Sequence, residues 1–310
     1  MLIGELDRGS LALRLRTEGI HLDTGAFTTL LRITLPHLVD EFAEMYAHYQ
    51  FEDPPTIDDA DVLISAPSLL RRYVGAQAQV WVDGIRMFAP VPAERAYTAL
   101  ETALNWGVAS SEVAPLLLHS AVVERDGRAL LLPAATGSGK STLCAALSLR
   151  GWRLLSDEMV VLGLEDGLVR PNPRPVSLKN RAIGIIAAFS PHARMTTTYR
   201  GTHKGDVAYM QAPAASVARA HETVAPALVI SPAYVDGAKT SLTPLEKAAG
   251  MRLLIDNAVN YASMLDTGFG IFSNIAERCA IYSLTYSSLD QAIETIDRVY
   301  QDSSPLARSA

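Results

Sequence analysis

One nine-residue segment constrains the fold of this chain more than any other. Residues 134–142 read AATGSGKST, which is the G-x-x-x-x-G-K-[ST] pattern with alanine in its first position. An apolar run at 129–132 predicts a strand before the segment, and residues 143–150 predict a helix after it, ended by Gly151. A strand, a glycine-rich turn and a helix in this order are typical of a P-loop, which binds the phosphates of a nucleoside triphosphate.

The residue types of this segment suit a triphosphate bound together with Mg²⁺. Gly137 and Gly139 let backbone N–H groups approach phosphate oxygens, and the N-terminus of the following helix adds a partial positive charge. We expect Lys140 to reach the β- and γ-phosphates and the hydroxyl of Ser141 to bind Mg²⁺. The residues predicted to bind the nucleotide are Thr136, Gly137, Ser138, Gly139, Lys140, Ser141 and Thr142.

Two adjacent carboxylates, Asp157 and Glu158, stand at the end of the next predicted strand. In a parallel sheet, the ends of this strand and of the strand before the P-loop lie at the same edge. Phosphoryl transfer to a hydroxyl uses one carboxylate to bind Mg²⁺ and can use another to accept the hydroxyl proton. We predict that Asp157 and Glu158 share these roles, in either order, and that Ser141 completes the predicted metal ligands. The alternative interpretation of the pair is a solvated acidic turn.

Length, net charge and cysteine content limit the classes of protein to which this chain can belong. The chain has 310 residues, of which 49% are hydrophobic, so it can form one large or two ordinary domains. Its net charge is −6 and it has no basic stripe, so we expect no nucleic-acid partner. Residues 1–7 do not resemble a signal peptide and no run reaches the ~18 apolar residues of a membrane span. Cys144 and Cys279 form no metal or disulfide pattern, which favours a reduced, cytoplasmic protein without membrane contact.

The chain divides into two predicted domains and a tail. Residues 1–105 predict an α+β domain that contains an amphipathic helix from Pro36, a break at 52–55 and a hairpin at 79–88. Residues 106–301 predict the domain that carries the P-loop, and residues 302–310 predict a disordered tail.

Four further segments of the second domain carry local signals. Residues 116–123 predict a strand that turns at Asp126-Gly127 into the strand before the P-loop. Residues 196–216 are rich in Thr, Gly and Ala and predict a mobile loop. The sequence at 243–246 is a capping box that predicts the start of a helix extending to Leu265. A last strand is predicted at 280–286 and a last helix at 288–300.

On these residues the chain resembles the HPr kinase/phosphorylase superfamily, which is related to the phosphoenolpyruvate carboxykinases. The family pattern is a histidine in the strand before a hairpin, a P-loop, one helix, and then RGH-x-L-x-x-D-D. Here the corresponding residues are His119, the segment 134–142, and RGWRLLSDE at 150–158. Glu158 stands where HPr kinase has aspartate.

A narrower resemblance is to the HPr-kinase-related proteins called related kinase A. Members of that group carry RGWRLLSDE and a downstream PRP-x-x-LKN. This chain has PRPVSLKN at 173–180 and HKG at 203–205. The match covers residues 116–206, and residues 1–105 carry no motif of this group.

The resemblance implies an α/β fold, with a P-loop kinase domain of the HPr kinase/phosphoenolpyruvate carboxykinase type and an N-terminal α+β domain. It implies ATP- and Mg²⁺-dependent phosphorylation of a hydroxyl, with serine as the expected residue, on a protein, a peptide or a small molecule. It also implies a homo-oligomer, and a role for His119 in organising the phosphate and metal region. Arg174, Lys179 and Lys204 are candidates for neutralising the transferred phosphate, because dispersed positive charge stabilises that transition state.

Three functions fit these sequence features. The leading one is a cytoplasmic kinase whose acceptor binds the N-terminal domain and the segment 196–216. A nucleotide-gated binding or scaffold module without turnover is the alternative, and the acidic pair argues against it. A general P-loop ATPase or transporter subunit is the third. Such proteins usually place their acidic strand far later in the chain, and no LSGGQ-like segment is present.

Overall fold

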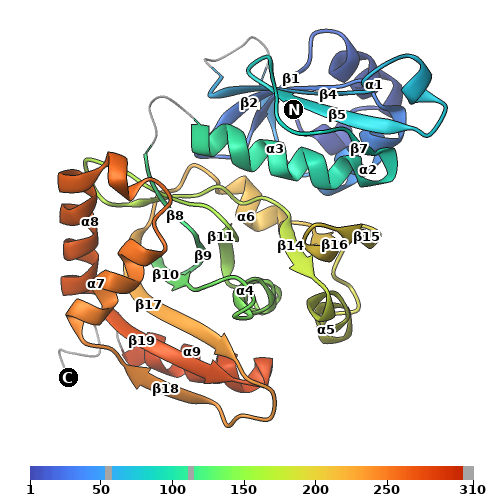
Figure 1. Cartoon of the computed structure of the whole chain (residues 1–310). Helices are drawn as coiled ribbons and strands as arrows, with labels where there is room; N and C mark the ends of the chain where they lie inside the picture. Colours follow the sequence, from blue (N-terminus) through green and yellow to red (C-terminus); the bar gives the residue numbers. More distant parts are fainter. Residues whose placement is uncertain (53–57, 111–114, 303–310) are drawn as a thin grey trace. The chain divides into compact units, whose positions relative to one another are not determined.

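The computed structural model describes residues 1–52, 58–110 and 115–302 of the chain, which has a mixed α/β fold. Two compact units are present, and Figure 1 shows the elements of each. Unit 1 comprises Met1–Ala114, Arg174–Ile183 and Ala193–Arg219, and unit 2 comprises Pro115–Pro173, Gly184–His192 and Ala220–Ala310. Within the described ranges, no helix combines the length and the apolar composition that crossing a bilayer requires.

The units differ from the predicted domains in two segments. Arg174–Ile183 and Ala193–Arg219 group with unit 1, although they lie within the second predicted domain, residues 106–301. The predicted disordered tail, 302–310, lies outside the described residues except for Asp302, which ends a helix. Most of the predicted break at 52–55 also lies outside them.

Unit 1 is built on a seven-stranded sheet with the order β3-β1-β2-β4-β5-β6, in which β7 also pairs with β5. Neighbouring strands are antiparallel except for β2 and β4, which are parallel. Helices α1, α2 and α3 pack against this sheet. The bounds are η1 Ile3–Glu5, α1 Arg8–Arg16, β1 Ile20–Asp23, β2 Thr28–Ile33, α2 Pro36–Met45, β3 Phe51–Glu52, β4 Ala60–Ser65, η2 Leu70–Arg72, β5 Gln77–Val82, β6 Ile85–Arg86, β7 Val91–Pro92, η3 Ala93–Arg95 and α3 Ala96–Ser110.

Local signals explain several of these elements. Pro36 occupies the first position of α2, where its missing N–H costs no hydrogen bond. Burial alternates along β2, as expected for a strand with one face in the core. Asp83 and Gly84 have φ values of 51° and 75°, which suit the two-residue turn between β5 and β6. The predicted helix from Pro36 and the predicted hairpin at 79–88 are therefore confirmed.

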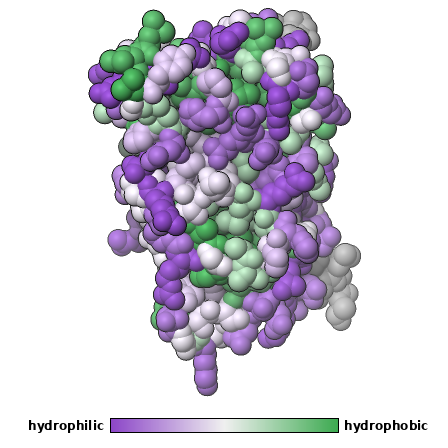
Figure 2. All heavy atoms as spheres, turned by 90° about the vertical axis from the view of Figure 1, so that its right-hand side faces the viewer, coloured by the Kyte–Doolittle hydropathy of each residue, from purple (hydrophilic) through white to green (hydrophobic). Residues whose placement is uncertain are grey.

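The surface of unit 1 carries large hydrophobic side chains in addition to polar ones. Figure 2 shows such side chains as green patches on the part of the surface that belongs to this unit. Leu69, Leu70, Tyr73 and Val74 are exposed between β4 and β5, and Ile85 is exposed in β6.

A second sheet of unit 1 has the order β14-β16-β15, and two of its strands, β15 and β16, form where the sequence predicts a mobile loop, at 196–216. That prediction is wrong. The segment forms a hairpin on β14, and Tyr199 stacks on Tyr97 of α3 at a ring-centroid distance of 6.1 Å and donates a hydrogen bond to Glu41 of α2. Tertiary contacts thus override the loop-like composition. The bounds are β14 Val176–Lys179, β15 Tyr199–Thr202, β16 Gly205–Met210 and α6 Ala214–Ala218, and α5 Arg181–Phe189 begins in unit 1 but has residues 184–189 in unit 2.

Unit 2 is built on a six-stranded sheet with the order β11-β9-β10-β17-β19-β18. Strand β9 is antiparallel to both of its neighbours, whereas β10, β17 and β19 are parallel to one another. The bounds are β9 Ser120–Arg125, β10 Arg128–Pro133, α4 Lys140–Leu149, β11 Arg153–Ser156, β17 Ala225–Tyr234, β18 Ser241–Pro244, α7 Lys247–Asp256, η4 Tyr261–Ser263, α8 Leu265–Arg278, β19 Ala280–Tyr286 and α9 Leu289–Asp302.

Helices cover both faces of this sheet (Figure 1). Val122, Leu131 and Val229 join Leu254 of α7 and Phe272 of α8 in one buried cluster. Helices α4 and α9 pack on the sheet as well and contact each other. Burying each large apolar side chain contributes about 1.5–3 kcal/mol, so these layers give unit 2 a core of its own.

The predicted helix that begins at the capping box 243–246 is corrected by the structure. Thr243 and Pro244 belong to β18 and pair with Ser283 and Tyr282 of β19. The helix starts at Lys247 and ends at Asp256, so it does not extend to Leu265. Strand pairing thus prevails over a local capping pattern. The predicted last strand and last helix are confirmed as β19 and α9.

A small sheet with the order β13-β12-β8 completes unit 2. Its bounds are β8 Leu116–Leu118, β12 Val160–Leu162 and β13 Val169–Arg170. The predicted single strand at 116–123 is therefore two strands in two sheets, and His119 is the residue between them. The N–H of His119 donates to the carbonyl of Asn257 at 2.8 Å, which holds the chain where it changes sheets.

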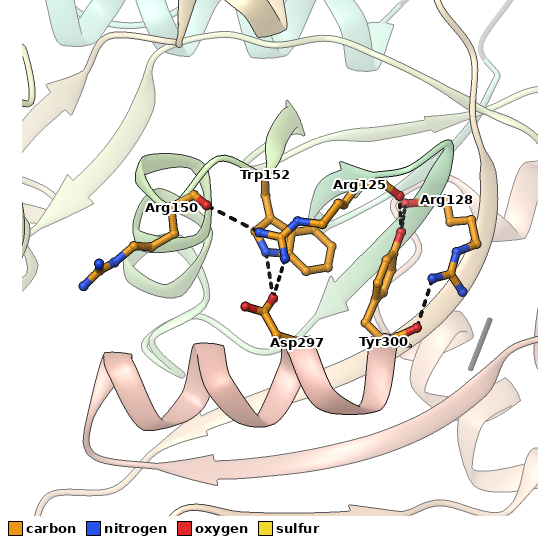
Figure 3. Close-up of polar contacts among 6 residues, drawn as sticks. All are labelled: Arg125, Arg128, Arg150, Trp152, Asp297 and Tyr300. Carbon is orange, nitrogen blue, oxygen red and sulfur yellow. Dashed lines mark hydrogen bonds and ion pairs between the residues drawn. The ribbon is translucent and has the colours of Figure 1, made fainter. Parts of the chain in front are cut away.

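A group of polar and aromatic side chains fastens α9 to the end of the sheet where β9 turns into β10 (Figure 3). Asp297 accepts hydrogen bonds from Arg125 at 2.7 Å and from the indole N–H of Trp152 at 3.2 Å. The Arg125 guanidinium lies over the Trp152 ring, 4.3 Å from its centroid. Tyr300 packs edge-on against the same ring, and its hydroxyl lies 2.6 Å from the carbonyl oxygen of Arg128.

We expect Asp297→Ala to destabilise the fold by about 1–3 kcal/mol, because it leaves the buried Trp152 and the half-buried Arg125 without this acceptor. Urea unfolding followed by tryptophan fluorescence measures this change. Glu294→Ala is the matched control, since Glu294 is an exposed carboxylate on the same helix. Equal midpoints for the two variants would show that the Asp297 contacts add nothing to stability.

Candidate functional site

Three strand ends meet at one edge of the six-stranded sheet. Strand β10 ends at Pro133, opposite the first residue of β9, and β11 ends at Ser156. Because β9 runs antiparallel between β10 and β11, its start lies at the same edge as the ends of these two strands. The sequence predicts that the ends of β10 and β11 share an edge, and this is confirmed, although an antiparallel strand separates them.

A glycine-rich loop, residues 134–139, joins β10 to α4. The predicted strand, turn and helix are therefore confirmed. Gly137 and Gly139 have φ values of 88° and 87°, which glycine adopts without strain. A Cβ at Gly137 would meet no atom within 4 Å, whereas one at Gly139 would lie 2.4 Å from the hydroxyl of Tyr286. Position 139 therefore needs glycine for two reasons: its positive φ and the lack of space for a Cβ.

The loop and the start of α4 have the features of an anion site. Residues 135–137 are exposed, and Gly139 is the N-cap of α4 without any side-chain cap hydrogen bond. The N–H groups in the first turn of a helix have no hydrogen-bond acceptor within the helix. Together with the positive end of the helix dipole, they suit phosphate oxygens. The open space around Gly137 lets a ligand approach the backbone there.

Lys140 and His119, two of the predicted site residues, are in contact. The ammonium Nζ of Lys140 lies 3.1 Å from Nε2 of His119. Because a lysine ammonium has only donors, Lys140 donates and Nε2 accepts, so the ring proton of the neutral imidazole is on Nδ1. Lys140 is only 6% exposed, although its side chain is charged. His119 therefore fixes the direction of a buried cation beside the loop.

Asp157 is also buried at this edge, directly after β11. Burial raises the pKa of the Cys144 thiol on α4, the charge of Asp157 raises it further, and the charge of Lys140 lowers it. The charges of Asp157 and Lys140 thus both act on Cys144, which lies on α4, the helix that starts after the loop. Glu158 follows and is half-buried, in a turn that the hydroxyl of Ser156 closes by donating to the carbonyl of Met159 at 2.7 Å.

The donor set at this edge suits Mg²⁺. Among the described residues, no group of three or more His, Cys, Asp or Glu side chains could hold a metal ion by itself. Mg²⁺ is usually held by one or two carboxylates, together with water and substrate phosphates. Asp157, Glu158 and the half-buried Ser141 in the first turn of α4 supply oxygen ligands of that kind.

We expect both cysteines to resist alkylation in the native protein. The pKa of Cys144 is raised by burial and by Asp157, and burial raises the pKa of Cys279 to about 12. A raised pKa keeps the thiol protonated at about pH 8, and only the thiolate reacts. Mass spectrometry after iodoacetamide treatment should find label only when urea is present. In Cys279→Ser, rapid labelling without urea would contradict the buried position of Cys144.

Arg174 lies in unit 1, where it forms part of a buried network. Its guanidinium donates to Asn105 and lies 3.8 Å from a carboxylate oxygen of Glu101. Glu101 is 3% exposed and also accepts a hydrogen bond from the hydroxyl of Tyr46 at 2.8 Å. A buried carboxylate requires such a counter-charge. The predicted catalytic role of Arg174 stays a prediction.

Lys179 and Lys204 also belong to unit 1 and lie at the same end of the β14-β16-β15 sheet. Asn180, which follows Lys179, exchanges hydrogen bonds with Asp206: its N–H donates to the Asp206 carbonyl at 2.8 Å, and its side-chain oxygen accepts from the Asp206 N–H at 3.1 Å. A Cβ at Gly205 would lie 2.4 Å from that oxygen. The structure thus brings together the segments LKN and HKG, and the catalytic role of the two lysines stays a prediction.

Two tyrosines that sequence reasoning missed also reach the glycine-rich loop. The hydroxyl of Tyr286 donates to the carbonyl of Gly139 at 3.0 Å, and the N–H of Tyr234 donates to the carbonyl of Ser138 at 2.9 Å. They end β19 and β17, which run parallel to β10. The signal that could have found them is their position at the carboxyl ends of parallel strands, where ligand sites form.

No protein-family model matches this chain, and no curated protein matches it. Among solved structures, the chain is similar to an HPr(Ser) kinase/phosphatase from Coxiella burnetii, with 15% sequence identity and a TM-score of 0.28. The alignment covers 60% of this chain and 95% of that chain. A similarity of this size assigns the chain to no family, so the function proposed below rests on the chain's own residues.

Proposed function

We propose that this chain is a Mg²⁺-dependent kinase that transfers the γ-phosphate of ATP to a hydroxyl group. One observation carries the proposal: the glycine-rich loop, Lys140, His119 and Asp157 lie at one edge of one sheet. A loop that suits phosphates would by itself fit many functions. A buried cation and a buried carboxylate beside it are the further groups that phosphoryl transfer requires.

The first task of the site is to hold the triphosphate. The N–H groups of the loop and of the first turn of α4 would donate to phosphate oxygens. Lys140 donates to His119, and its ammonium group is the proposed cation for the β- and γ-phosphates. In this proposal His119 is a positioning residue, since it aims the ammonium group before the nucleotide arrives.

The second task is the transfer itself. Mg²⁺, when bound by Ser141 and a carboxylate, would neutralise charge on the β- and γ-phosphates. Asp157 and Glu158 divide metal binding and proton acceptance between them. The accepting carboxylate takes the hydroxyl proton while the acceptor oxygen forms its bond to the γ-phosphorus. The bond from that phosphorus to the β–γ bridging oxygen breaks, and ADP leaves with the electron pair.

The acceptor is a hydroxyl-bearing protein, peptide or small molecule, with serine as the expected residue. Lys179 and Lys204, in the segments LKN and HKG, are the proposed cations for the transferred phosphate. The buried ion pair of Arg174 with Glu101 favours a structural role for that arginine. A cytoplasmic location and self-association stay predictions.

Label transfer from ATP tests this proposal and can identify the acceptor. The purified protein is incubated with γ-³²P-ATP and Mg²⁺, alone and in lysate of the native host. We expect a labelled protein band or metabolite that is absent when Lys140→Ala replaces the native protein. Saturable ATP binding without any labelled product would overturn the kinase proposal and favour a nucleotide-gated binding module.

A further inference from the structure

We propose that Tyr234 provides the face on which the nucleobase of the bound nucleotide stacks, and that Tyr286 positions the glycine-rich loop beside it. This inference rests on the proposed function, since it concerns the base of the nucleotide whose phosphates the loop would hold. It adds a subsite for an aromatic base, formed by residues that no motif of the sequence points to.

The strand order gives the direction in which the nucleotide would lie. Strands β9 and β11 lie on one side of β10, with His119 and Asp157 at their ends, and β17 and β19 lie on the other. The ammonium of Lys140 points toward His119, on the β9 side. The γ-phosphate must lie on that side, near the cation and the carboxylates. The nucleoside therefore leaves the loop toward the end of β17, where Tyr234 is the last residue.

The backbone of Tyr234 is hydrogen-bonded to the loop. Its N–H donates to the carbonyl of Ser138 at 2.9 Å, and a Cβ at position 139 would lie 3.0 Å from the Tyr234 Cβ. Tyr286 supports both groups from within the protein. It is 1% exposed, its hydroxyl donates to the carbonyl of Gly139 at 3.0 Å, and its ring lies edge-on to that of Tyr234 at 5.7 Å.

The Tyr234 side chain is both held and accessible. Its hydroxyl lies 3.1 Å from a carboxylate oxygen of Asp236, yet 36% of the residue is exposed. The next residue, Val235, is 49% exposed, and its N–H donates to the carbonyl of Tyr286 at 2.9 Å. An aromatic ring fixed in place beside a phosphate site offers a π-face to any base at little cost in conformational entropy.

A comparison of two ligands separates base stacking from phosphate binding. Dissociation constants for Mg²⁺–ATP and for Mg²⁺–tripolyphosphate are measured by calorimetry for the native protein, Tyr234→Ala and Tyr234→Phe. Loss of one base–aromatic stack weakens binding by about tenfold. We therefore expect Tyr234→Ala to bind ATP about tenfold more weakly and tripolyphosphate unchanged, and Tyr234→Phe to match the native protein. Tyr286→Phe, which removes the hydrogen bond to the loop, should weaken both ligands.

The outcomes also separate this inference from the proposed function. If Tyr234→Ala leaves ATP affinity unchanged, or weakens ATP and tripolyphosphate equally, there is no base stack on Tyr234 and the inference is overturned, while the kinase proposal stands. If the native protein binds neither ligand, the proposed function and the inference both fail. Unchanged tripolyphosphate binding by Tyr234→Ala and Tyr234→Phe checks that the loop is folded in these two variants.

Discussion

Lys140→Ala is expected to abolish detectable phosphate transfer and to weaken Mg²⁺–ATP binding by about a hundredfold, because it removes the buried cation that follows the glycine-rich loop. In the native protein this ammonium lies beside neutral His119 and suits the charge of a terminal phosphate. Alanine offers no donor, so that charge would lie uncompensated in a buried site. Calorimetric titration with Mg²⁺–ATP and the label-transfer assay measure the two effects.

Two further variants control for loss of fold in this experiment. Lys140→Met keeps most of the apolar stem but not the charge, so it should lose transfer as alanine does while retaining the native unfolding midpoint. Lys247→Ala removes an exposed lysine of α7 in the same unit and should leave binding and transfer unchanged. Full ATP affinity and transfer in Lys140→Ala would mean that the glycine-rich loop is not the nucleotide site.

The combined substitution Asp157→Asn and Glu158→Gln is expected to lower phosphate transfer by about a thousandfold or more, since it removes both the proton acceptor and the carboxylate for Mg²⁺. Both changes nearly preserve side-chain volume. ATP binding without Mg²⁺ should persist, because the loop and Lys140 are untouched. Initial rates of label transfer, with ATP affinity measured in the presence and absence of Mg²⁺, distinguish these effects.

The chain provides a matched control for the acidic pair. Glu165 and Asp166 are adjacent, exposed carboxylates in the same unit, and Glu165→Gln with Asp166→Asn makes the same change of charge. This control should keep native rates. Native transfer rates in the Asp157 and Glu158 double variant would rule out the assigned chemistry, whichever of the two residues is the base.

Local sequence signals predicted the parts of this fold that depend on neighbouring residues. Pro36 starts a helix, Asp126 and Gly127 form a two-residue turn with positive φ, and the apolar run before the glycine-rich loop is a strand. Each of these signals acts within a few residues. The position of Asp157 at the same edge as the loop was also predictable, because the alternation of strand and helix fixes which strand ends face the same way.

Long-range pairing decided the parts that were not predicted. His119 separates two strands in different sheets, and this depends on β8 pairing with β12, far along the chain. The hairpin at 199–210 is held by contacts of Tyr199 with Tyr97 and Glu41, and no local sequence pattern predicts these contacts. Tyr286 reaches the loop from the end of a strand 147 residues away in sequence. Such contacts depend on the order of strands in the sheet, which cannot be predicted from a single sequence.

The most direct test of this account is a crystal structure of the protein with Mg²⁺ and a non-hydrolysable ATP analogue. The account predicts that the triphosphate lies in the loop at 134–142, with the γ-phosphate against the ammonium of Lys140. It also predicts Mg²⁺ between Ser141 and the carboxylates of Asp157 and Glu158. A nucleotide bound elsewhere, or a loop that stays empty at saturating nucleotide, would contradict it.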